Sequence, residues 1–223
     1  MELKGAVAVV TGANRGLGRH LADQLVQRGA KVYAAARRPE SVDLAGVTPL
    51  RLDVTDEESV RAAARVASDA TLLVNNAGIS TGATLVSGGL DAVRLEFETN
   101  FFGPLALTRA FAPVIEGNGG GAVLNVLSAL SWLHPAGLGS YAATKAATWA
   151  QTNAVREELA PRGITVTALH VAYMDTDMAT RVAADQKVDP ADVAAQALNA
   201  VADGLPEILA DDVTRQVKRG LAA

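Results

Sequence analysis

The sequence contains no cysteine, which excludes disulfides, thiolate nucleophiles and zinc sites with cysteine ligands. Its start, MELKGAVAVVTGANRG, has an apolar stretch that is too short to span a membrane, and it has neither the basic flank nor the cleavage pattern of a signal peptide. Its histidines, His20, His134 and His170, are scattered without the spacing of metal ligands. We therefore expect a cytoplasmic protein with no metal site, in which the histidines have packing or surface roles.

An excess of positive charge is absent as well, because 20 Lys and Arg are outnumbered by 24 Asp and Glu. Nucleic acids and anionic membranes bind concentrated basic surfaces, so neither is an expected partner. The composition, with 49% hydrophobic and 20% charged residues, is that of a globular protein with a sizeable core, and it favours a small soluble ligand. No Pro/Ser-rich linker or repeat divides the chain, so residues 1–223 are expected to form one domain.

Short apolar runs rich in Val and Ala alternate with helical patterns. The runs are continuous, as in strands buried on both faces, and they are AVAVVTG from Ala6, KVYAAA from Lys31, TLLVNNAG from Thr71, GAVLNVLS from Gly121 and GITVTALH from Gly163. Among the helical patterns, LGRHLADQLVQRGA ends at Gly29, TDEESVRAAARVAS opens with Thr55 as N-cap, and DPADVAAQALNAVADG opens with Asp189 and Pro190. The alternation predicts an α/β fold, a doubly wound parallel sheet with helices on both faces.

A glycine-rich loop, TGANRGLG, directly follows the first predicted strand and leads into a helix. Its glycines, Gly12, Gly16 and Gly18, permit a tight turn, after which the helix start presents free N–H groups and a positive dipole to a pyrophosphate. A purely structural turn would also use glycine. The position of the loop between a strand and a helix favours a dinucleotide.

The end of the second predicted strand distinguishes the two nicotinamide dinucleotides. An acidic residue there would bond the ribose 2′-hydroxyl of NAD, whereas an arginine accommodates the 2′-phosphate of NADP. Ala36 stands where the acid is expected, Arg37 and Arg38 follow it, and Arg15 lies in the glycine loop. Guanidinium groups bind phosphate by paired hydrogen bonds, so the three arginines favour NADP(H) over the alternative of solvated surface charges.

The segment YAATKAATWA places Tyr141 and Lys145 four positions apart. In a helix these positions lie on one face, so the phenol and the ammonium would share one space. A neighbouring cation raises the acidity of a phenol, which makes it a useful proton donor near neutral pH. A surface helix with two long side chains is the alternative that the pair alone leaves open.

With further motifs, these residues resemble the classical short-chain dehydrogenase/reductase family over nearly the whole chain. The resemblance rests on the order and spacing of TGANRGLG, Asp53 in RLDVTD, NNAG at residues 75–78, Asn100 in ETNFFG, Ser128 in NVLSALS, and YAATK. It implies a single-domain Rossmann fold that transfers a hydride between a nicotinamide cofactor and a carbonyl or secondary alcohol. The catalytic residues implied by the resemblance are Asn100, Ser128, Tyr141 and Lys145.

The resemblance also implies a role for each residue. Tyr141 would give its proton to the nascent alkoxide, Ser128 would orient the substrate oxygen, and Lys145 would bind the nicotinamide ribose, while Asn100 would hold a water that links Lys145 to solvent. Asp53 and the backbone of Val54 would hold the adenine. The full set of expected cofactor contacts is Gly12, Asn14, Arg15, Gly16, Leu17, Gly18, Arg37, Arg38, Asp53, Val54, Asn76, Ala77, Gly78, Tyr141, Lys145, Tyr173 and Thr176.

Three alternatives stand beside this assignment. GISTG around Ser80 matches the serine-hydrolase pattern G-x-S-x-G, but a loop-like sequence follows where that nucleophile needs a helix. Ser131 competes with Ser128, and the spacing to Tyr141 favours Ser128. A non-catalytic NADP(H)-binding sensor is the alternative function, but a sensor has no chemical need to keep all four catalytic residue types.

Two features depart from the family pattern. Val171 and Ala172 stand where the family has Pro-Gly close to the nicotinamide, and a helix start at Asp189 leaves room for only a short lid over the substrate.

The family also assembles through two long helices, here residues 100–116 and 140–160, so we expect a homodimer or homotetramer. Five apolar residues lie in segments that face the substrate in the family, with ordinary packing as an equal alternative: Trp132, Leu133, Leu138, Met174 and Met178.

Overall fold

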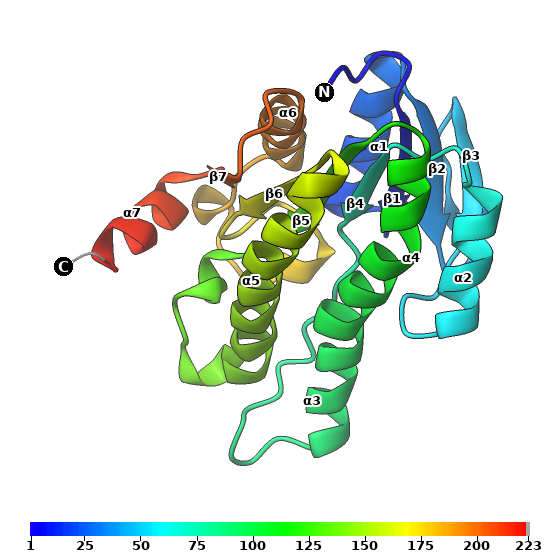
Figure 1. The fold of residues 1–223 in the computed structure, drawn as a ribbon. Coiled ribbons are helices and arrows are strands. Elements are labelled where there is room, and N and C mark those ends of the chain that lie inside the picture. The colour runs from blue at the N-terminus through cyan, green and yellow to red at the C-terminus, as the bar shows by residue number, and fades with distance from the viewer. Residues whose placement is uncertain (222–223) are drawn as a thin grey trace.

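The computed structural model describes residues 1–221, which form one parallel sheet between two layers of helices (Figure 1). Its seven strands follow the order β3-β2-β1-β4-β5-β6-β7, and each neighbouring pair is parallel. The strands are β1 (Val7–Thr11), β2 (Lys31–Ala36), β3 (Val47–Arg51), β4 (Leu72–Asn75), β5 (Gly121–Val126), β6 (Ile164–His170) and β7 (Glu207–Leu209). The expected doubly wound α/β fold is confirmed.

Five of the strands lie where apolar runs predict them, whereas β3 and β7 carry no such run. β3 lies at the edge of the sheet, and Thr48, Pro49 and Arg51 are exposed. β7 has only three residues, all partly buried. A continuous apolar run marks strands that are covered on both faces, so it does not reveal strands at the edges.

The main helices are α1 (Gly16–Gln27), α2 (Glu57–Val66), α3 (Leu90–Phe97), α4 (Gly103–Gly117), α5 (Gly139–Leu159), α6 (Pro190–Ala202) and α7 (Asp212–Gly220). The predicted N-cap of α2 is wrong, because Asp56 caps this helix and its carboxylate accepts a hydrogen bond from the N–H of Glu58. Thr55 instead directs its hydroxyl to Asp53 in the preceding turn. The predicted cap of α6 by Asp189 is confirmed.

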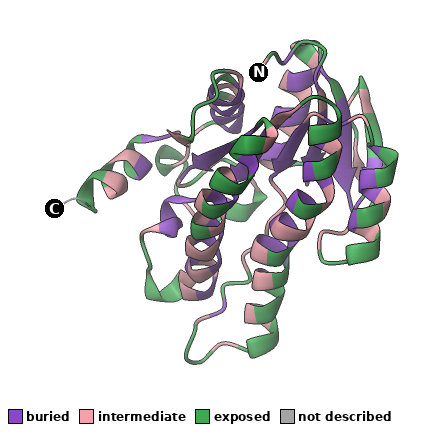
Figure 2. Cartoon of the chain, viewed as in Figure 1, coloured by how far each residue is buried: buried purple, intermediate pink, exposed green. Residues whose placement is uncertain are grey.

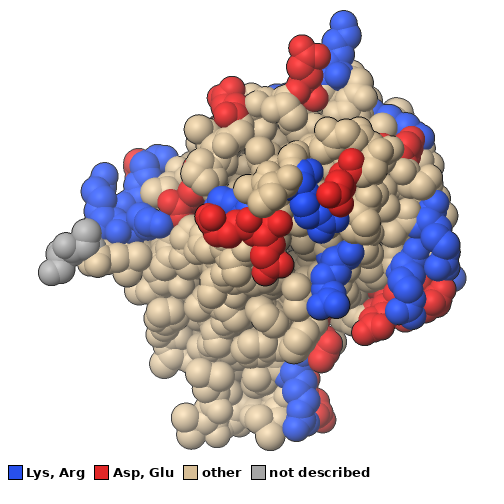
Figure 3. Space-filling view, in the orientation of Figure 1, with Lys and Arg blue, Asp and Glu red and all other residues tan. Residues whose placement is uncertain are grey.

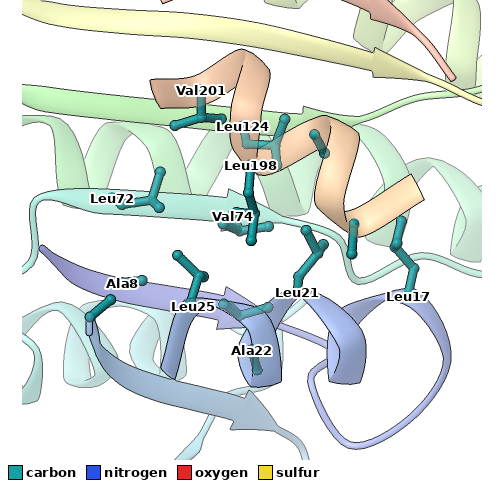
Figure 4. Packing of buried hydrophobic residues seen from close by; sticks show 14 of the residues in the cluster. Ala8, Leu17, Leu21, Ala22, Leu25, Leu72, Val74, Leu124, Leu198 and Val201 are labelled. Carbon is teal, nitrogen blue, oxygen red and sulfur yellow. The ribbon is translucent and has the colours of Figure 1, made fainter. Parts of the chain in front are cut away.

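Each face of the sheet is covered by helices whose buried sides face the strands (Figure 2). In β1 the side chains alternate, so that Ala8 and Val10 pack with α1 and α6 while Val9 packs with α2, α4 and α5. Figure 4 shows Leu21 and Leu25 of α1 and residues of α6 pointing into the first of these cores. This packing fixes the sheet so that the carboxyl ends of the strands meet at one edge.

A π turn interrupts the long helical segment that precedes β5. α3 continues through a π turn at Glu98–Phe102 into α4, so the helix expected to begin at Asn100 in fact begins ten residues earlier, at Leu90. Thr99 and Asn100 are buried in this turn. π turns insert an extra residue into a helix and frequently occur at functional sites.

α5 carries a row of buried hydroxyl groups, one of which bonds to the sheet. Thr144, Thr148 and Thr152 follow one another at intervals of four residues, and all three are buried. Asn125 of β5 donates a hydrogen bond of 3.0 Å to the hydroxyl of Thr152, and Asn75 of β4 donates one of 2.8 Å to Asn125. Directional bonds therefore fix the position of α5 against the sheet more tightly than apolar packing alone would.

The lid expected after β6 is short. Its two ends, after β6 and before α6, are joined by backbone bonds: Val188 N–H donates to the carbonyl of Tyr173, and Asp175 N–H donates to that of Val188. Between these contacts it contains two short turns, Asp177–Ala179 and Ala184–Gln186. No helix within residues 1–221 is long and apolar enough to cross a bilayer.

Candidate active site

The glycine loop joins β1 to α1 where the strand order of the sheet reverses, between β1 and β4. Gly12 and Gly16 have φ angles of 65° and 52°, in the left-handed region that favours glycine. A Cβ at Gly18 would lie only 2.3 Å from the carbonyl oxygen of Gly12. Within residues 1–221 no side chain caps the start of α1, so its first N–H groups are available to an anion such as a pyrophosphate.

The other predicted residues of this loop differ in exposure. Arg15 is exposed and Asn14 partly buried, so both side chains can reach a ligand. Leu17, by contrast, is buried in the core, and only its backbone is open to a contact. Arg15 forms an ion pair of 3.1 Å with Asp177, and this pair joins the glycine loop to the lid.

The NNAG segment forms a wall of the glycine loop. Asn76 donates from its amide to the carbonyl oxygens of Thr11 and Gly12, and the hydroxyl of Thr11 accepts from the backbone N–H groups of Asn76 and Ala77. A Cβ at Gly12 would lie 3.1 Å from the Cα of Ala77. The side chain of Asn76 therefore holds the loop, and the backbone of residues 76–78 is left to line a ligand site.

Arg37 and Arg38 follow β2 and are exposed, whereas Ala36 is buried at the end of the strand. Burial alone would raise the pKa of Asp53, but hydrogen bonds from Thr55 and the charge of Arg37 lower it overall. Arg37 thus lies close enough to Asp53 for their charges to interact. The structure brings the residues expected at the adenosine end of the cofactor to one edge of the sheet.

Tyr141 and Lys145 lie on one face of α5, as their spacing predicts. The ammonium of Lys145 lies 5.5 Å from the centre of the Tyr141 ring. Lys145 is only 6% exposed, and its Nζ donates a hydrogen bond of 2.8 Å to the carbonyl of Val126 at the end of β5. A Cβ at Gly78 would lie 3.9 Å from that Nζ and 3.2 Å from Asn100 Oδ1, so three predicted residues converge there.

Burial governs the ionisation of this pair. It lowers the pKa of Lys145 from 10.5 to about 8 and raises the pKa of Tyr141, which the charge of Glu96 raises further. The protein alone therefore keeps the phenol protonated, which is the form that donates a proton. The pKa of Tyr141 is raised, so the more acidic phenol expected from the neighbouring Lys145 is not found in the protein by itself.

Asn100 links the loop after β4 to α5. Its Oδ1 accepts from the N–H of Ile79 at 2.9 Å, and its Nδ2 donates to the Ile79 carbonyl at 2.9 Å and to the Thr144 hydroxyl at 3.1 Å. The hydroxyl of Thr148 lies 2.9 Å from the carbonyl oxygen of Asn100. These bonds fix the π turn beside Lys145, and the water-binding role of Asn100 stays a prediction.

Ser128 follows β5 and begins a short turn, Ala129–Ser131, that packs against α5. Its Oγ accepts a hydrogen bond of 3.1 Å from the N–H of Leu130, so the hydroxyl proton is free to be donated to a substrate oxygen. Ser131 lies in the same turn and is also buried. The choice of Ser128 stays a prediction from its spacing to Tyr141.

The lid lies against the start of α1. Thr176 would contact a Cβ at Gly16 at 3.4 Å, so it lies beside the glycine loop, while Tyr173 is 40% exposed. Of the five apolar residues expected to face a substrate, Trp132 stacks on His170 and Met174 packs against the core, so these two have packing contacts. Leu133 and Met178 are exposed and Leu138 is partly buried.

Val171 and Ala172 fit their positions without backbone strain. No non-glycine residue within 1–221 has a positive φ. Val171 is buried in the core, and the N–H of Ala172 donates a hydrogen bond of 2.8 Å to Asp211. The same carboxylate caps α7 through Thr214. The C-terminal helix is therefore anchored to the backbone that follows β6.

Sequence reasoning missed three residues near the site. Asp211 could have been found from the capping pattern that precedes α7. Glu96 is fully buried and binds the N–H and hydroxyl of Thr81, and His170 is fully buried beside Ser128. A lone glutamate and a lone histidine carry no signal in a single sequence, because their neighbours come from distant segments.

Comparisons with known proteins identify the family. The family model for short chain dehydrogenase matches residues 6–187. The chain is 32% identical over 197 residues to 3-oxoacyl-acyl-carrier-protein reductase FabG of Vibrio cholerae, covering 84% of this chain and 81% of that protein. It is 33% identical over 189 residues to NADPH-dependent 1-acyldihydroxyacetone phosphate reductase of Schizosaccharomyces pombe, covering 81% of this chain and 64% of the relative.

A solved structure is similar over the full chain. It is a short chain dehydrogenase from Burkholderia cenocepacia in complex with NADP, with 38% sequence identity and a TM-score of 0.95, covering 100% of this chain and 95% of that one. The protein therefore belongs to the short-chain dehydrogenase family and is an oxidoreductase of that family.

The buried ammonium of Lys145 predicts a specific pH dependence of stability. The unfolded chain binds this proton up to about pH 10.5 and the folded chain only up to about pH 8, so deprotonation of Lys145 raises the free energy of unfolding as pH rises between these values. Lys145→Met removes this contribution. The difference in free energy of unfolding, variant minus parent, should fall as pH rises from about 8 to 10.5 in urea titrations without cofactor. A difference independent of pH would contradict it, and exposed Lys4→Met is the control.

Proposed function

We propose that the protein is an NADP(H)-dependent oxidoreductase that transfers a hydride between the nicotinamide and a carbonyl or secondary alcohol. The observation that carries the proposal is the convergence of Lys145, Asn100 and Gly78 beside the ring of Tyr141, in a chain that matches the family model for short chain dehydrogenase. The names of both reductases compared above describe substrates with a ketone group, which supports a carbonyl substrate here.

The proposed mechanism assigns one task to each side chain. A bound NADPH supplies the hydride. Tyr141, kept protonated by burial and by Glu96, donates its phenolic proton to the oxygen that becomes the alcohol. The free hydroxyl proton of Ser128 forms a hydrogen bond to the same oxygen and stabilises the negative charge that develops on it. Lys145 holds the cofactor ribose and supplies positive charge beside the phenol.

The preference for NADP(H) rests on the arginines. Arg15, Arg37 and Arg38 are exposed at the glycine loop and at the end of β2, where a 2′-phosphate would lie, and buried Ala36 offers no carboxylate to a 2′-hydroxyl. The similar structure from Burkholderia cenocepacia contains NADP. A sensor without catalysis is disfavoured, because binding alone gives no reason to bury the ammonium of Lys145 beside a phenol.

Tyr141→Phe removes the proposed proton donor and leaves the ring. We expect activity on a ketone to fall by at least about a hundredfold, in line with the usual contribution of general acid catalysis, while the Kd of NADPH changes little. Steady-state kinetics and fluorescence titration measure the two effects. Tyr33→Phe, whose phenol bonds Lys31 and Asp69 outside the site, is the matched control. Turnover of the Tyr141 variant within a few-fold of the parent would show that the acid is misassigned.

Arg37→Asp tests the cofactor preference. The parent should use NADPH with a higher kcat/KM than NADH, and the variant should lose about 1.5–3 kcal/mol of NADPH binding and so flatten or reverse the preference. Arg219→Asp, at an exposed position of α7, is the charge-matched control. Equal kcat/KM for the two cofactors in the parent would overturn the assignment.

We infer that the protein forms a homodimer or homotetramer. Several large apolar side chains are exposed on and before the helical segment that runs parallel to α5, namely Leu85, Val86, Leu90, Leu95 and Phe102. Figure 3 shows that the lower part of this face, over α5 and the loop before α3, is largely free of charged side chains. Such patches mark protein interfaces. Light scattering at micromolar concentration should give at least twice the monomer mass, and a monomer would refute the inference.

A further inference from the structure

A buried histidine contacts the backbone of the proposed catalytic serine. His170 ends β6, and its side chain is fully buried. Its Nδ1 lies 3.1 Å from the carbonyl oxygen of Ser128, which also accepts the N–H of Ser131 at 3.0 Å. The ring therefore touches the first residue of the turn that carries the serine hydroxyl, and it has no route to a substrate of its own.

The surroundings of the ring determine which nitrogen carries the proton. Burial lowers the pKa of His170 to about 3, so the ring is neutral and has one N–H. Both nitrogens face acceptors, because Nε2 lies 3.4 Å from a carboxylate oxygen of Glu207. That carboxylate is already paired with Lys218 at 2.8 and 3.0 Å. Within residues 1–221, Nδ1 forms the hydrogen bond of the ring and Nε2 has no hydrogen-bond partner, so the geometry assigns the proton to Nδ1, which donates to Ser128.

Aromatic packing holds the ring in this orientation. Trp132 stacks on His170 with 4.0 Å between ring centres and 20° between planes, and Trp149 meets it edge-on at 4.9 Å. The ammonium of Lys218 lies 4.3 Å from the Trp132 ring centre and 5.0 Å from that of Trp149. Trp132 directly follows the Ser128 turn. The C-terminal helix α7 therefore contacts, through Lys218, the tryptophan that stacks on His170 at the end of this turn.

We propose that His170 is a positioning residue for Ser128, an inference that rests on the catalytic role of Ser128 proposed above. The donated hydrogen bond fixes the carbonyl of Ser128 and with it the peptide that leads into the turn. Within that turn the N–H of Leu130 holds the serine Oγ as an acceptor. Fixing the peptide therefore fixes the position of the hydroxyl oxygen from which the proton is donated. A group positioned in this way affects the rate of the chemical step more than it affects cofactor binding.

Two conservative substitutions separate positioning from packing. The side-chain amide nitrogen of His170→Asn can occupy the place of Nδ1 and donate to Ser128, whereas that of His170→Gln can occupy only the place of Nε2 on the Glu207 side. His170→Phe keeps an aromatic ring and has no donor. We would measure kcat and KM on one ketone, the Kd of NADPH by fluorescence, and the melting temperature, for the parent, these three variants and Ser128→Ala.

The expected result is a loss of kcat of roughly tenfold to a hundredfold in the Gln and Phe variants, with an unchanged Kd for NADPH, and recovery to within about threefold of the parent in the Asn variant. The positioning role would be overturned if the Asn and Gln variants had the same melting temperature and also the same kcat. It would also be overturned if kcat simply followed melting temperature across the set of variants. If His170→Phe does not fold, the Asn and Gln pair decides.

Ser128→Ala distinguishes failure of this inference from failure of the proposed function. If Ser128→Ala is inactive while the Asn and Gln variants have the same kcat, the serine role stands and the histidine role falls. If Ser128→Ala retains the activity of the parent, the serine assignment is wrong, and the role of His170 falls with it.

Discussion

The burial of one ammonium group is the constraint on which the site depends. Lys145 is almost fully enclosed, and its charge is held by the carbonyl at the end of β5. An enclosed cation is costly unless it has close partners, so the surrounding segments must approach it at defined distances. The phenol of Tyr141 lies beside the ammonium, and Gly78 lies close to both the ammonium and Asn100 of the π turn. Burial lowers the pKa of Lys145, which shows that the enclosure disfavours the charged form of this side chain in the free protein.

The rest of the fold holds these segments close to Lys145. Thr152 of α5 bonds to Asn125 in the centre of the sheet, and Asn125 bonds to Asn75 in turn, which fixes the helix that carries Tyr141 and Lys145. The glycines of the first loop allow α1 to begin against the NNAG segment, where a single added methyl group at Gly18 would collide with the carbonyl of Gly12. Close packing of backbone on backbone thus places a helix N-terminus and a proton donor at the same edge of the sheet.

Sequence alone predicts the parts of this protein that depend on local pattern. The five central strands have continuous apolar runs, and the spacing of Tyr141 and Lys145 places them on one helix face. It does not predict β3, whose exposed edge carries no apolar run, or the π turn, which looks like ordinary helix in sequence. The contacts of His170 and Glu96 near the site are not predicted from the sequence for another reason. Their partners, such as Ser128 and Thr81, come from distant segments, so only folding makes them neighbours.

In the proposed reaction this site moves a hydride from a nicotinamide to a carbonyl carbon, with Tyr141 supplying the proton. The most direct measurement is transfer of deuterium from NADPH labelled at the nicotinamide C4 position to a ketone, followed by mass spectrometry of the alcohol. We expect one deuterium per molecule of alcohol, bound to the carbinol carbon, from one of the two C4-labelled epimers, and almost no labelled product with Tyr141→Phe. Consumption of NADPH without deuterium in the alcohol, or equal labelling by Tyr141→Phe and the parent, would contradict it.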